Sequence, residues 1–243
     1  MDWFFIENAG SVGDLHLITG EDAVHITKSL RMSVGEVISL CDSDQKEHLC
    51  MIEKIDSSGV LVRITTEEEC THEPDIQLTL YFALTKGDKP ETVIQKCIEL
   101  GVTKIVPVLT DRCVSRPDAK AAEKKLARYR KIALGAAMQS RRGIIPEVLP
   151  LTDLKKAASE LGSYDKAILF YEGGGEPLRE LIKPEDKKIA VFIGPEGGFE
   201  EREVELLCSS GAKTATLGKR ILRAETAPIA AAAAIMFHTG NLE

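Results

Sequence analysis

Residues Ile189–Gly198 read IAVFIGPEGG, and a second unusual run, LGKRILRAETAPIAAAAA, follows at Leu217–Ala234. The first run begins with five apolar residues that end at Gly194-Pro195, which is typical of a short buried strand. Its three glycines allow positive φ or a close approach of the backbone to a ligand. The glutamate-rich segment that follows predicts a helix, because the helix dipole favours acidic residues in the first turn. Together these features predict a βα unit whose loop lies at the ligand-binding edge of an α/β sheet.

The glycine spacing differs from that of known phosphate-binding loops. Gly194–Gly198 is not G-x-G-x-x-G, and Gly218–Arg220 lacks the Ser or Thr that follows Gly-Lys in a P-loop. A nucleoside triphosphatase is therefore disfavoured. Taken alone, the first loop is explained equally well by a tight turn that needs glycine for packing. The second run favours a ligand site, because it also places a glycine at the end of a predicted strand, Lys213–Leu217.

Four long motifs carry a family resemblance. FIGPEGGFEEREVE at Phe192–Glu205 and LGKRILRAETAPIAA at Leu217–Ala231 resemble the RsmE family of bacterial small-subunit ribosomal RNA uridine N3 methyltransferases, in the SPOUT superfamily. Leu84–Arg116 and Tyr129–Val148, with its AAMQSRR core, are similar to the same family. The resemblance covers nearly the whole chain, and it implies that the function is methyl transfer to N3 of a specific uridine in 16S ribosomal RNA.

The N-terminal part is predicted to be a small β-rich domain. Several short strands separated by turns are typical of a barrel, and the acidic run Glu67–Glu69 with the residues up to Pro74 marks the expected boundary. The resemblance implies a PUA-like RNA-binding β-barrel over residues 1–72. The predicted elements are strands at Trp3–Glu7, Gly35–Asp42, Glu47–Asp56 and Gly59–Thr66, and one helix at Glu21–Arg31.

The C-terminal part, residues 73–243, is predicted to be an α/β domain with a mainly parallel sheet, because strand and helix patterns alternate. Periodicity alone favours an ordinary doubly wound sheet, since knotted chains are rare. The resemblance instead implies a SPOUT domain with a trefoil knot. The predicted strands are Gln77–Ala83, Lys104–Leu109, Lys166–Phe170, Ile189–Ile193 and Lys213–Leu217. The predicted helices are Pro90–Leu100, Ala119–Gln139, Leu154–Leu161, Pro177–Ile182, Glu200–Ser209 and Ala227–His238.

Composition sets limits on the class of protein. No apolar run approaches the roughly 20 residues of a membrane span, and Asp2 stands where a signal peptide would carry basic charge. We therefore expect a cytoplasmic protein without a membrane partner. Six scattered cysteines and five histidines lack metal-ligand spacing, so no metal site is predicted.

Charge is unevenly distributed along the chain. The net charge of −7 argues against a protein that coats nucleic acid non-specifically, but Lys120–Gly143 holds eight basic residues and one acidic residue, Glu123. Such a run is often only a solvated helix face. With an RNA enzyme implied, it predicts a phosphate-binding patch. The candidate RNA-binding residues are Arg31, Lys124, Arg128, Lys131, Arg141 and Arg142.

The resemblance implies S-adenosyl-L-methionine as cofactor, bound in the loops Phe170–Gly173, Gly194–Gly198 and Leu217–Leu222. It also implies a homodimer. The small residues of Ala227–Ala234 would permit close helix packing between subunits, although packing within one subunit explains them equally well. The candidate cofactor-binding residues are Phe170, Tyr171, Ile193, Gly194, Gly197, Gly198, Leu217, Gly218, Ile221 and Leu222.

Methyl transfer to N3 needs a group that removes the imide proton and a cation near the uracil oxygens. Arg223 is the first candidate for the cation, with Lys219 and Arg220 as alternatives. Glu196 and Glu225 are the catalytic carboxylate candidates. For Glu225, capping of the following helix is an equally good interpretation, and Glu196 is equally suited to contact the cofactor or the partner subunit.

Two other functions compete with this hypothesis. A ribosome-assembly protein without activity would keep the barrel and the basic helix, but degenerate glycine loops would be expected, and they are intact. A small-molecule enzyme with a nucleotide pocket would need neither the N-terminal domain nor the basic helix.

Overall fold

The computed structural model describes residues 2–242. Contacts between Cα atoms divide the chain into two compact units. Unit 1 comprises the described residues up to Glu73 together with Ala137–Ile144, and unit 2 comprises Pro74–Ala136 and the described residues from Ile145 onward. The short segment Ala137–Ile144 thus belongs to unit 1, although it is separated from the rest of that unit by more than sixty residues of sequence.

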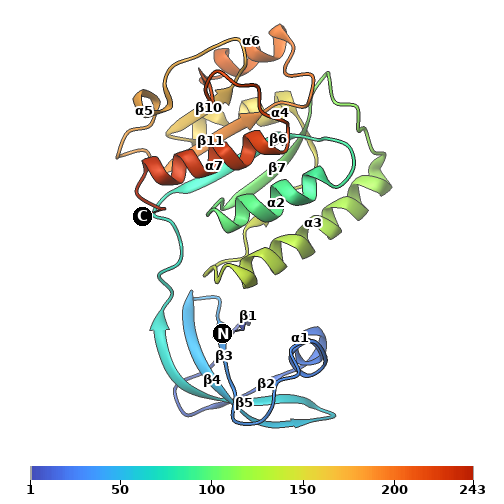
Figure 1. Ribbon diagram of the computed structural model, residues 1–243, viewed down its shortest axis with the longest axis vertical. Helices are drawn as coiled ribbons and strands as arrows, with labels where there is room; N and C mark the ends of the chain where they lie inside the picture. The colour runs from blue at the N-terminus through green and yellow to red at the C-terminus, as the bar shows by residue number, and fades with distance from the viewer. Residues whose placement is uncertain (1, 243) are drawn as a thin grey trace. The chain divides into compact units, whose positions relative to one another are not determined.

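Unit 1 is built on a five-stranded sheet of order β1-β3-β4-β5-β2 (Figure 1). Strand β1 pairs with β3 in parallel, and the other neighbours are antiparallel. Buried side chains from all five strands meet in one core, because alternate residues of each strand point to the same face. The strands are β1 (Trp3–Phe5), β2 (Leu15–Ile18), β3 (Val37–Cys41), β4 (Lys46–Asp56) and β5 (Gly59–Glu69).

Three details of unit 1 differ from the sequence prediction. The helix expected at Glu21–Arg31 is a short α-helix, α1 (Gly20–Val24), that continues as one π-helical turn, η1 (His25–Ser29). Strand β2 was not predicted. The strand predicted at Gly59–Thr66 is longer, because β5 continues through the acidic run Glu67–Glu69, where Glu69 pairs with Lys46 in the ladder and Glu67 forms an ion pair with the same lysine at 2.5 Å.

Unit 2 contains a parallel sheet of order β12-β10-β11-β6-β7-β8, with β9 beside β7. Strand β11 lies in the middle, pairing with β10 on one side and β6 on the other, and five of its six residues are buried. This agrees with the apolar run that predicted it. The strands are β6 (Gln77–Ala83), β7 (Lys104–Leu109), β8 (Glu147–Val148), β9 (Thr152–Asp153), β10 (Lys166–Phe170), β11 (Lys188–Ile193) and β12 (Lys213–Ala215).

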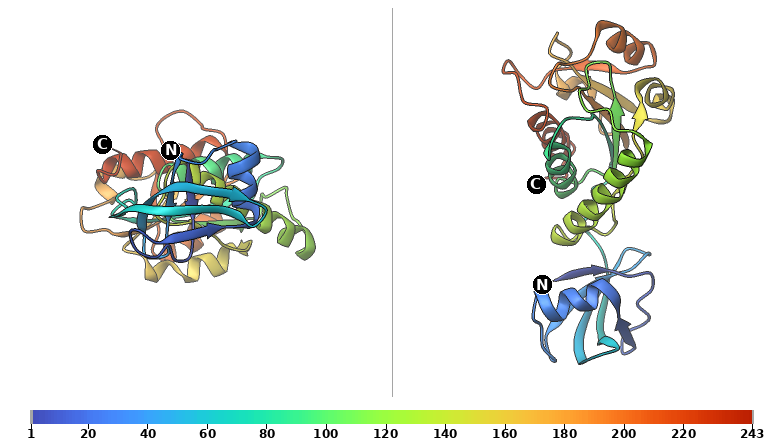
Figure 2. Two further views of the ribbon diagram at one scale, coloured as in Figure 1. Left: turned by 90° about the horizontal axis from the view of Figure 1, so that it is seen from below. Right: turned by 90° about the vertical axis from the view of Figure 1, so that its right-hand side faces the viewer.

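Helices cover both faces of this sheet, which is the layered arrangement expected of an α/β domain. Helices α2 and α7 pack together over β6 and β11, while α4 and α6 pack together on the other face (Figure 2). The buried residues Val93, Ile94, Cys97 and Ile98 give α2 one apolar stripe. The helices are α2 (Lys89–Glu99), α3 (Ala119–Gln139), α4 (Leu154–Ser159), the 3₁₀ turn η2 (Leu161–Ser163), α5 (Leu178–Leu181), α6 (Glu201–Ser209) and α7 (Thr226–His238).

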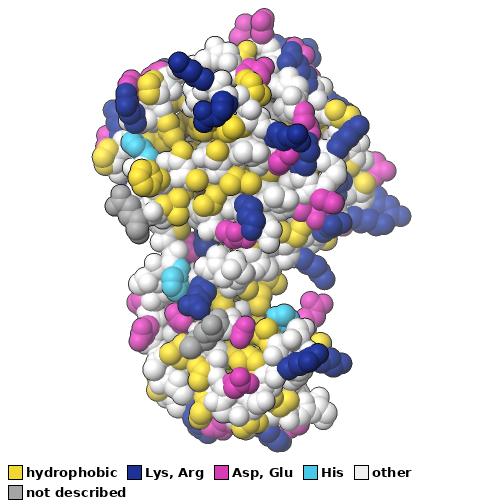
Figure 3. Space-filling view, in the orientation of Figure 1, with side chains coloured by type: hydrophobic (Ala, Val, Ile, Leu, Met, Phe, Trp, Pro, Cys, Tyr) yellow, Lys and Arg dark blue, Asp and Glu magenta, His cyan; other side chains and the backbone are white. Residues whose placement is uncertain are grey.

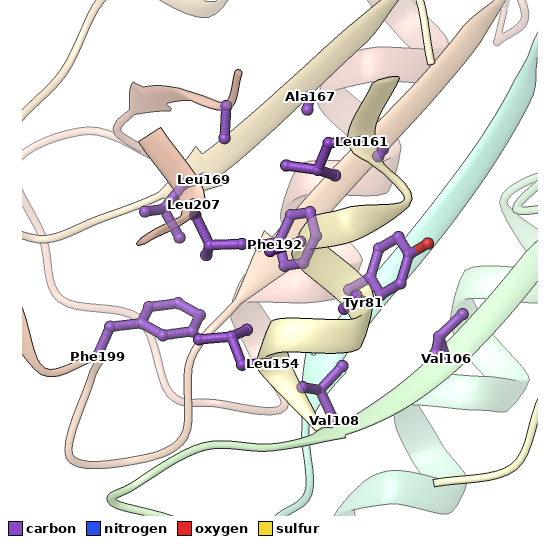
Figure 4. Close-up of a cluster of buried hydrophobic side chains, with 14 residues drawn as sticks. Tyr81, Val106, Val108, Leu154, Leu161, Ala167, Leu169, Phe192, Phe199 and Leu207 are labelled. Carbon is purple, nitrogen blue, oxygen red and sulfur yellow. The ribbon is translucent and has the colours of Figure 1, made fainter. Parts of the chain in front are cut away.

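The core beneath α4 and α6 fixes the central strands. Tyr81 of β6 stacks on Phe192 of β11 with ring centroids 4.5 Å apart, and Leu154, Leu207 and Phe199 pack around them (Figure 4). Phe199 directly follows the glycine loop of β11, so the loop is anchored at its far end by a buried ring. The predicted strands at Gln77–Ala83, Lys104–Leu109 and Lys166–Phe170 have the observed bounds.

Candidate active site

A pocket of about 520 Å³ lies at the carboxyl ends of four neighbouring strands of unit 2. Three of its walls are the loops that follow β10, β11 and β12, and Lys89 contributes from the start of α2, the helix that follows β6. Open α/β sheets bind ligands at this edge. The sheet order therefore brings together three loops that the sequence predicted separately and one residue that it did not predict.

Nine of the ten residues predicted to bind a cofactor line this pocket: Phe170, Tyr171, Ile193, Gly194, Gly198, Leu217, Gly218, Ile221 and Leu222. The tenth, Gly197, belongs to the same loop, but its carbonyl oxygen accepts a hydrogen bond from Arg112 Nη1 at 2.5 Å. The structure gathers the predicted residues in one place, and their role in binding stays a prediction.

The glycines of the first loop meet specific backbone demands. Gly198 has φ +70° and donates its N–H to the carbonyl of Pro195, which closes a turn. A Cβ at Gly198 would lie 3.1 Å from a carboxylate oxygen of Glu172, and one at Gly194 would lie 3.1 Å from the ring of Phe199. Larger residues would therefore strain the turn or push into the neighbouring side chains.

The third loop leaves its backbone available. Within the described part of the chain, the backbone N–H and C=O groups of Leu217–Leu222 form no hydrogen bond, whereas backbone polar groups normally find partners. The side chain of Ile221 is 80% exposed at this wall. A loop that presents unpaired amides beside apolar side chains is suited to bind a flat, partly polar ligand.

Arg112 clamps the first loop from outside the pocket. Besides the Gly197 carbonyl, its Nε binds Glu200 Oε1 at 2.8 Å, and this contact holds the pKa of the Glu200 carboxyl below its usual value. Glu200 and Glu203 form a capping box at the start of α6. The loop is thus fixed between Arg112 and a capped helix, so the pocket wall is preformed.

Three charged side chains meet at the rim. Lys89 Nζ lies 2.7 Å from Glu196 Oε1 and 3.4 Å from Glu225 Oε2. The hydrogen bond from Lys89 lowers the pKa of Glu196. The structure thus brings both predicted catalytic carboxylates together, and it adds Lys89. Sequence reasoning missed this lysine because only the pairing of β6 with β11 places the loop after β6 beside the glycine loop.

Arg223, the predicted catalytic cation, lines the pocket together with both alternatives, Lys219 and Arg220. Among the described residues, none of these three side chains forms an ion pair. The carbonyl of Arg223 accepts hydrogen bonds from the backbone N–H groups of Thr226 and Ala227, both at 2.9 Å. Its backbone is therefore fixed to the start of α7 while its guanidinium is free to meet a substrate.

The predicted RNA-binding residues of unit 2 share one face of α3. Lys124, Arg128 and Lys131 are all exposed, and their spacing places them within about a quarter of the helix circumference. Arg128 also forms an ion pair with Glu91 at 2.6 Å. These three cations form an exposed stripe suited to phosphate groups.

In unit 1, Arg31 and Arg141 are exposed, and each has φ +56°. Backbones of non-glycine residues rarely take this conformation, and such strain gathers at functional positions. Their role as RNA contacts stays a prediction.

Arg142 needs a correction. Its residue surface is only 2% exposed, and its guanidinium donates to both carboxylate oxygens of Glu73 at 2.7 and 2.6 Å. Glu73 also accepts the backbone N–H groups of Gly143 and Ile144. Arg142 is thus a structural residue of unit 1, and the prediction of an RNA contact there is wrong because basic character alone did not reveal its burial.

Two kinds of feature are absent from the described residues. No helix in residues 2–242 has the length and apolar character needed to cross a membrane. In the same residues, no three His, Cys, Asp or Glu side chains converge in the way that would hold a metal ion.

Comparison with known proteins gives the family. The RNA methyltransferase domain matches residues 72–236, and the RNA methyltransferase PUA domain matches residues 18–65. The chain is 34% identical over 229 residues to the ribosomal RNA small subunit methyltransferase E of Bacillus subtilis, covering 91% of this chain and 90% of that protein. It is 32% identical over 200 residues to the protein of the same name from Aquifex aeolicus, covering 79% and 81%.

The fold agrees with a solved structure. The crystal structure of ribosomal RNA small subunit methyltransferase E from Neisseria gonorrhoeae, bound to S-adenosyl methionine, superimposes with a TM-score of 0.88 at 32% identity, covering 98% of this chain and 97% of that chain. The predicted architecture of a PUA-like domain and an α/β domain with a parallel sheet is confirmed, while the knot stays a prediction. The chain belongs to the ribosomal RNA small subunit methyltransferase E family, RsmE.

Proposed function

We propose that this protein transfers a methyl group from S-adenosylmethionine to N3 of a specific uridine in 16S ribosomal RNA of the small ribosomal subunit. The observation that carries the proposal is the pocket itself: three glycine-bearing loops meet at the carboxyl edge of the parallel sheet, together with Lys219, Arg220 and Arg223, whose side chains form no ion pair among the described residues. Membership in the RsmE family supports the same reaction. Because the substrate is ribosomal RNA, we place the enzyme in the cytoplasm.

The pocket fits the cofactor in size and chemistry. Its volume of about 520 Å³ is in the range of ligand sites. The unpaired backbone groups of Leu217–Leu222 can read the edges of an adenine ring, and Ile193, Leu217 and Leu222 supply apolar walls. When bound there, S-adenosylmethionine supplies a methyl group activated by its sulfonium sulfur.

The chain's own residues then have three tasks. The clamped first loop and the fixed start of α7 hold the reacting groups in line, and orientation of this kind contributes on the order of 7 to 11 kcal/mol in good intramolecular systems. A carboxylate at the rim accepts the imide proton. Arg223 stabilises the negative charge that spreads over the uracil oxygens as the proton leaves.

The proposed homodimer rests on α7. Ala230, Ala233 and Ala234 are partly exposed, and Phe237 is 64% exposed. Figure 3 shows hydrophobic side chains gathered on the face of unit 2 that carries this helix. Ala227 of the same helix lines the pocket, so a second copy packed against α7 would adjoin the bound cofactor.

Replacing Gly198 with alanine is expected to weaken S-adenosylmethionine binding about tenfold. A side chain at φ +70° strains the turn by roughly 1 kcal/mol or more, and its Cβ would press on Glu172 in the pocket wall. Isothermal titration calorimetry measures the change. The matched control is Gly211→Ala, which has φ +108° and nothing within 4 Å of the added Cβ. Equal affinity for the two variants would contradict a role of the Gly198 turn in binding.

Replacing Lys124 and Lys131 together with alanine is expected to weaken RNA binding and to flatten its salt dependence. Each lost phosphate contact lowers the slope of log K against log salt by roughly 0.9 on duplex and 0.7 on single-stranded nucleic acid. Filter binding to small ribosomal subunits over a range of salt concentrations measures both quantities. The control removes the same charge from α4 with Lys155→Ala and Lys156→Ala, which are exposed on another helix. An unchanged slope in the α3 variant would exclude this stripe from the RNA surface.

The proposed function is tested with labelled S-adenosylmethionine and small ribosomal subunits that lack the modification. We expect label at N3 of one uridine of 16S ribosomal RNA, located by digestion and mass spectrometry. Tight binding to the subunit without incorporation would reject methyl transfer and favour an assembly protein instead.

A further inference from the structure

Lys89 joins the two carboxylates at the pocket rim, and it holds them unequally. Its ammonium is 2.7 Å from Glu196 Oε1, within hydrogen-bond distance, and 3.4 Å from Glu225 Oε2. The three residues come from different parts of unit 2: Lys89 begins α2, Glu196 lies in the loop after β11, and Glu225 directly precedes α7. One ammonium group therefore lies within ion-pair distance of both carboxylates that could accept a proton.

The two carboxylates differ in burial and in hydrogen bonding. Glu225 occupies the N-cap position of α7, yet its side chain accepts no hydrogen bond from the helix, so the capping interpretation does not account for it. Its Oε2 is buried and, among the described residues, has no hydrogen-bond partner. Glu196 is more exposed, at 44% of its side chain against 24% for Glu225. A buried carboxylate oxygen without a hydrogen bond is costly unless it has a task.

Base strength points the same way. The hydrogen bond from Lys89 lowers the pKa of Glu196, and a carboxylate with a lowered pKa is a weaker proton acceptor. Glu225 Oε2 lies farther from the same ammonium, at 3.4 Å against 2.7 Å for Glu196 Oε1, so Lys89 holds it less tightly. The competition between the two carboxylates for Lys89 therefore favours Glu225 as the group that receives a proton.

We propose that Lys89 is a positioning residue that holds Glu225 at the pocket rim as the proton acceptor for methyl transfer. This inference rests on the proposed function. The N3 proton passes to a Glu225 oxygen, the electron pair of N3 forms the new bond to the methyl carbon, and the sulfur keeps the electron pair of the bond that breaks. In this assignment Lys89 contacts neither the uracil nor S-adenosylmethionine, and it acts through its ion pair with Glu225.

The first test compares Lys89→Met with Lys89→Arg and with Lys86→Met. Lys86 is exposed in the segment between β6 and α2 and forms no ion pair among the described residues. Its charge also lowers the pKa of Glu196, so its variant removes a nearby charge while leaving the ion pairs of Lys89 in place. We expect Lys89→Met to lower kcat about 10- to 100-fold with little change in KM for RNA or S-adenosylmethionine, since misplacing a catalytic group by about 1 Å costs up to about 100-fold. Lys89→Arg should restore most of the rate, and Lys86→Met should match the unchanged protein.

A double-mutant cycle tests the coupling. Glu225→Gln alone should lower kcat by about 10² to 10⁴, the range for loss of a general base, and Lys89→Met should add little to it because both changes remove one function. Glu196→Gln should cost less than Glu225→Gln. Circular dichroism and a cofactor-binding isotherm on each variant exclude unfolding and loss of the pocket as the cause.

Two results would overturn the inference while leaving the proposed function intact. An increase in KM for RNA at unchanged kcat in Lys89→Met would make Lys89 a phosphate contact. A loss of kcat in the double variant equal to the product of the two single losses would show that Lys89 and Glu225 act independently. Failure of the proposed function is distinguishable, because in that case the unaltered protein itself transfers no methyl group to N3.

Discussion

Replacing Glu73 with alanine is expected to lower the free energy of unfolding of unit 1 by about 3 to 5 kcal/mol, the cost of removing one partner of a buried ion pair. Glu73 is 15% and Arg142 3% exposed at their side chains, and Glu73 receives hydrogen bonds from the guanidinium and from the N–H groups of Gly143 and Ile144. Without the carboxylate, the guanidinium and two amides lose this partner at once. The segment Ala137–Ile144 is therefore the part of unit 1 most affected.

The chain carries its own probe for this measurement. Trp3 is the single tryptophan, is 3% exposed, and packs edge-on against His72 with ring centroids 5.6 Å apart. Its fluorescence during urea unfolding reports on unit 1. The matched control is Glu68→Ala, an exposed carboxylate of β5 whose loss should change stability by less than about 0.5 kcal/mol. Coincident unfolding curves for the two variants would contradict a structural role of the Glu73–Arg142 pair.

The longer elements of unit 2 were predictable because their apolar residues are continuous or periodic, whereas β8 and β9, with two residues each, were not predicted. Strands β6, β7 and β10 have strong apolar runs, and α3 has the predicted bounds Ala119–Gln139. Buried parallel strands read as continuous hydrophobic segments, which local sequence reveals. The pocket loops after β10 and β11 could be predicted for the same reason, since each follows such a strand. The third loop follows β12, which ends at Ala215, two residues before the predicted end, and has one buried residue.

Unit 1 was less predictable because in places its apolar residues are exposed and its charged residues lie within a strand. Strand β2 exposes Leu15 and Leu17 and buries only Ile18, so its apolar residues do not mark a core face. The strand was predicted to end at Thr66 because the acidic run Glu67–Glu69 is depleted in apolar residues, but pairing with β4 continues the strand through it. Pairing with strands distant in sequence stabilises β2 and the end of β5, and the local sequence does not reveal this pairing.

The roles of single charged residues depended on tertiary neighbours. Lys89 reaches the pocket only because β6 lies beside β11, and Arg142 is withdrawn from the surface only because Glu73 faces it. A basic residue in sequence gives charge but not burial. Only the structure distinguishes the basic residues that line the pocket or lie on α3 from those that stabilise the fold.

Replacing Arg223 with alanine is expected to lower kcat for uridine methylation about 10² to 10³-fold, the usual cost of removing one donor that stabilises developing negative charge. Cofactor affinity should change little, because the guanidinium is assigned to the uracil oxygens and the backbone of Arg223 remains bonded to α7. Single-turnover methyl transfer to small ribosomal subunits separates this chemical step from RNA binding and product release.

Two neighbouring cations, Arg220 and Lys219, provide matched controls for this prediction. Arg220→Ala removes an equal charge from the same pocket wall and should affect kcat far less, and Lys219→Ala likewise. Arg223→Lys keeps the charge but not the planar fork, so a partial recovery would indicate that directed hydrogen bonds and charge both contribute. A collapse of kcat in Arg220→Ala with near-normal activity in Arg223→Ala would assign the role to the other arginine. The fixed backbone favours Arg223, since stabilisation of a transition state depends on donors that are already in place before the charge develops.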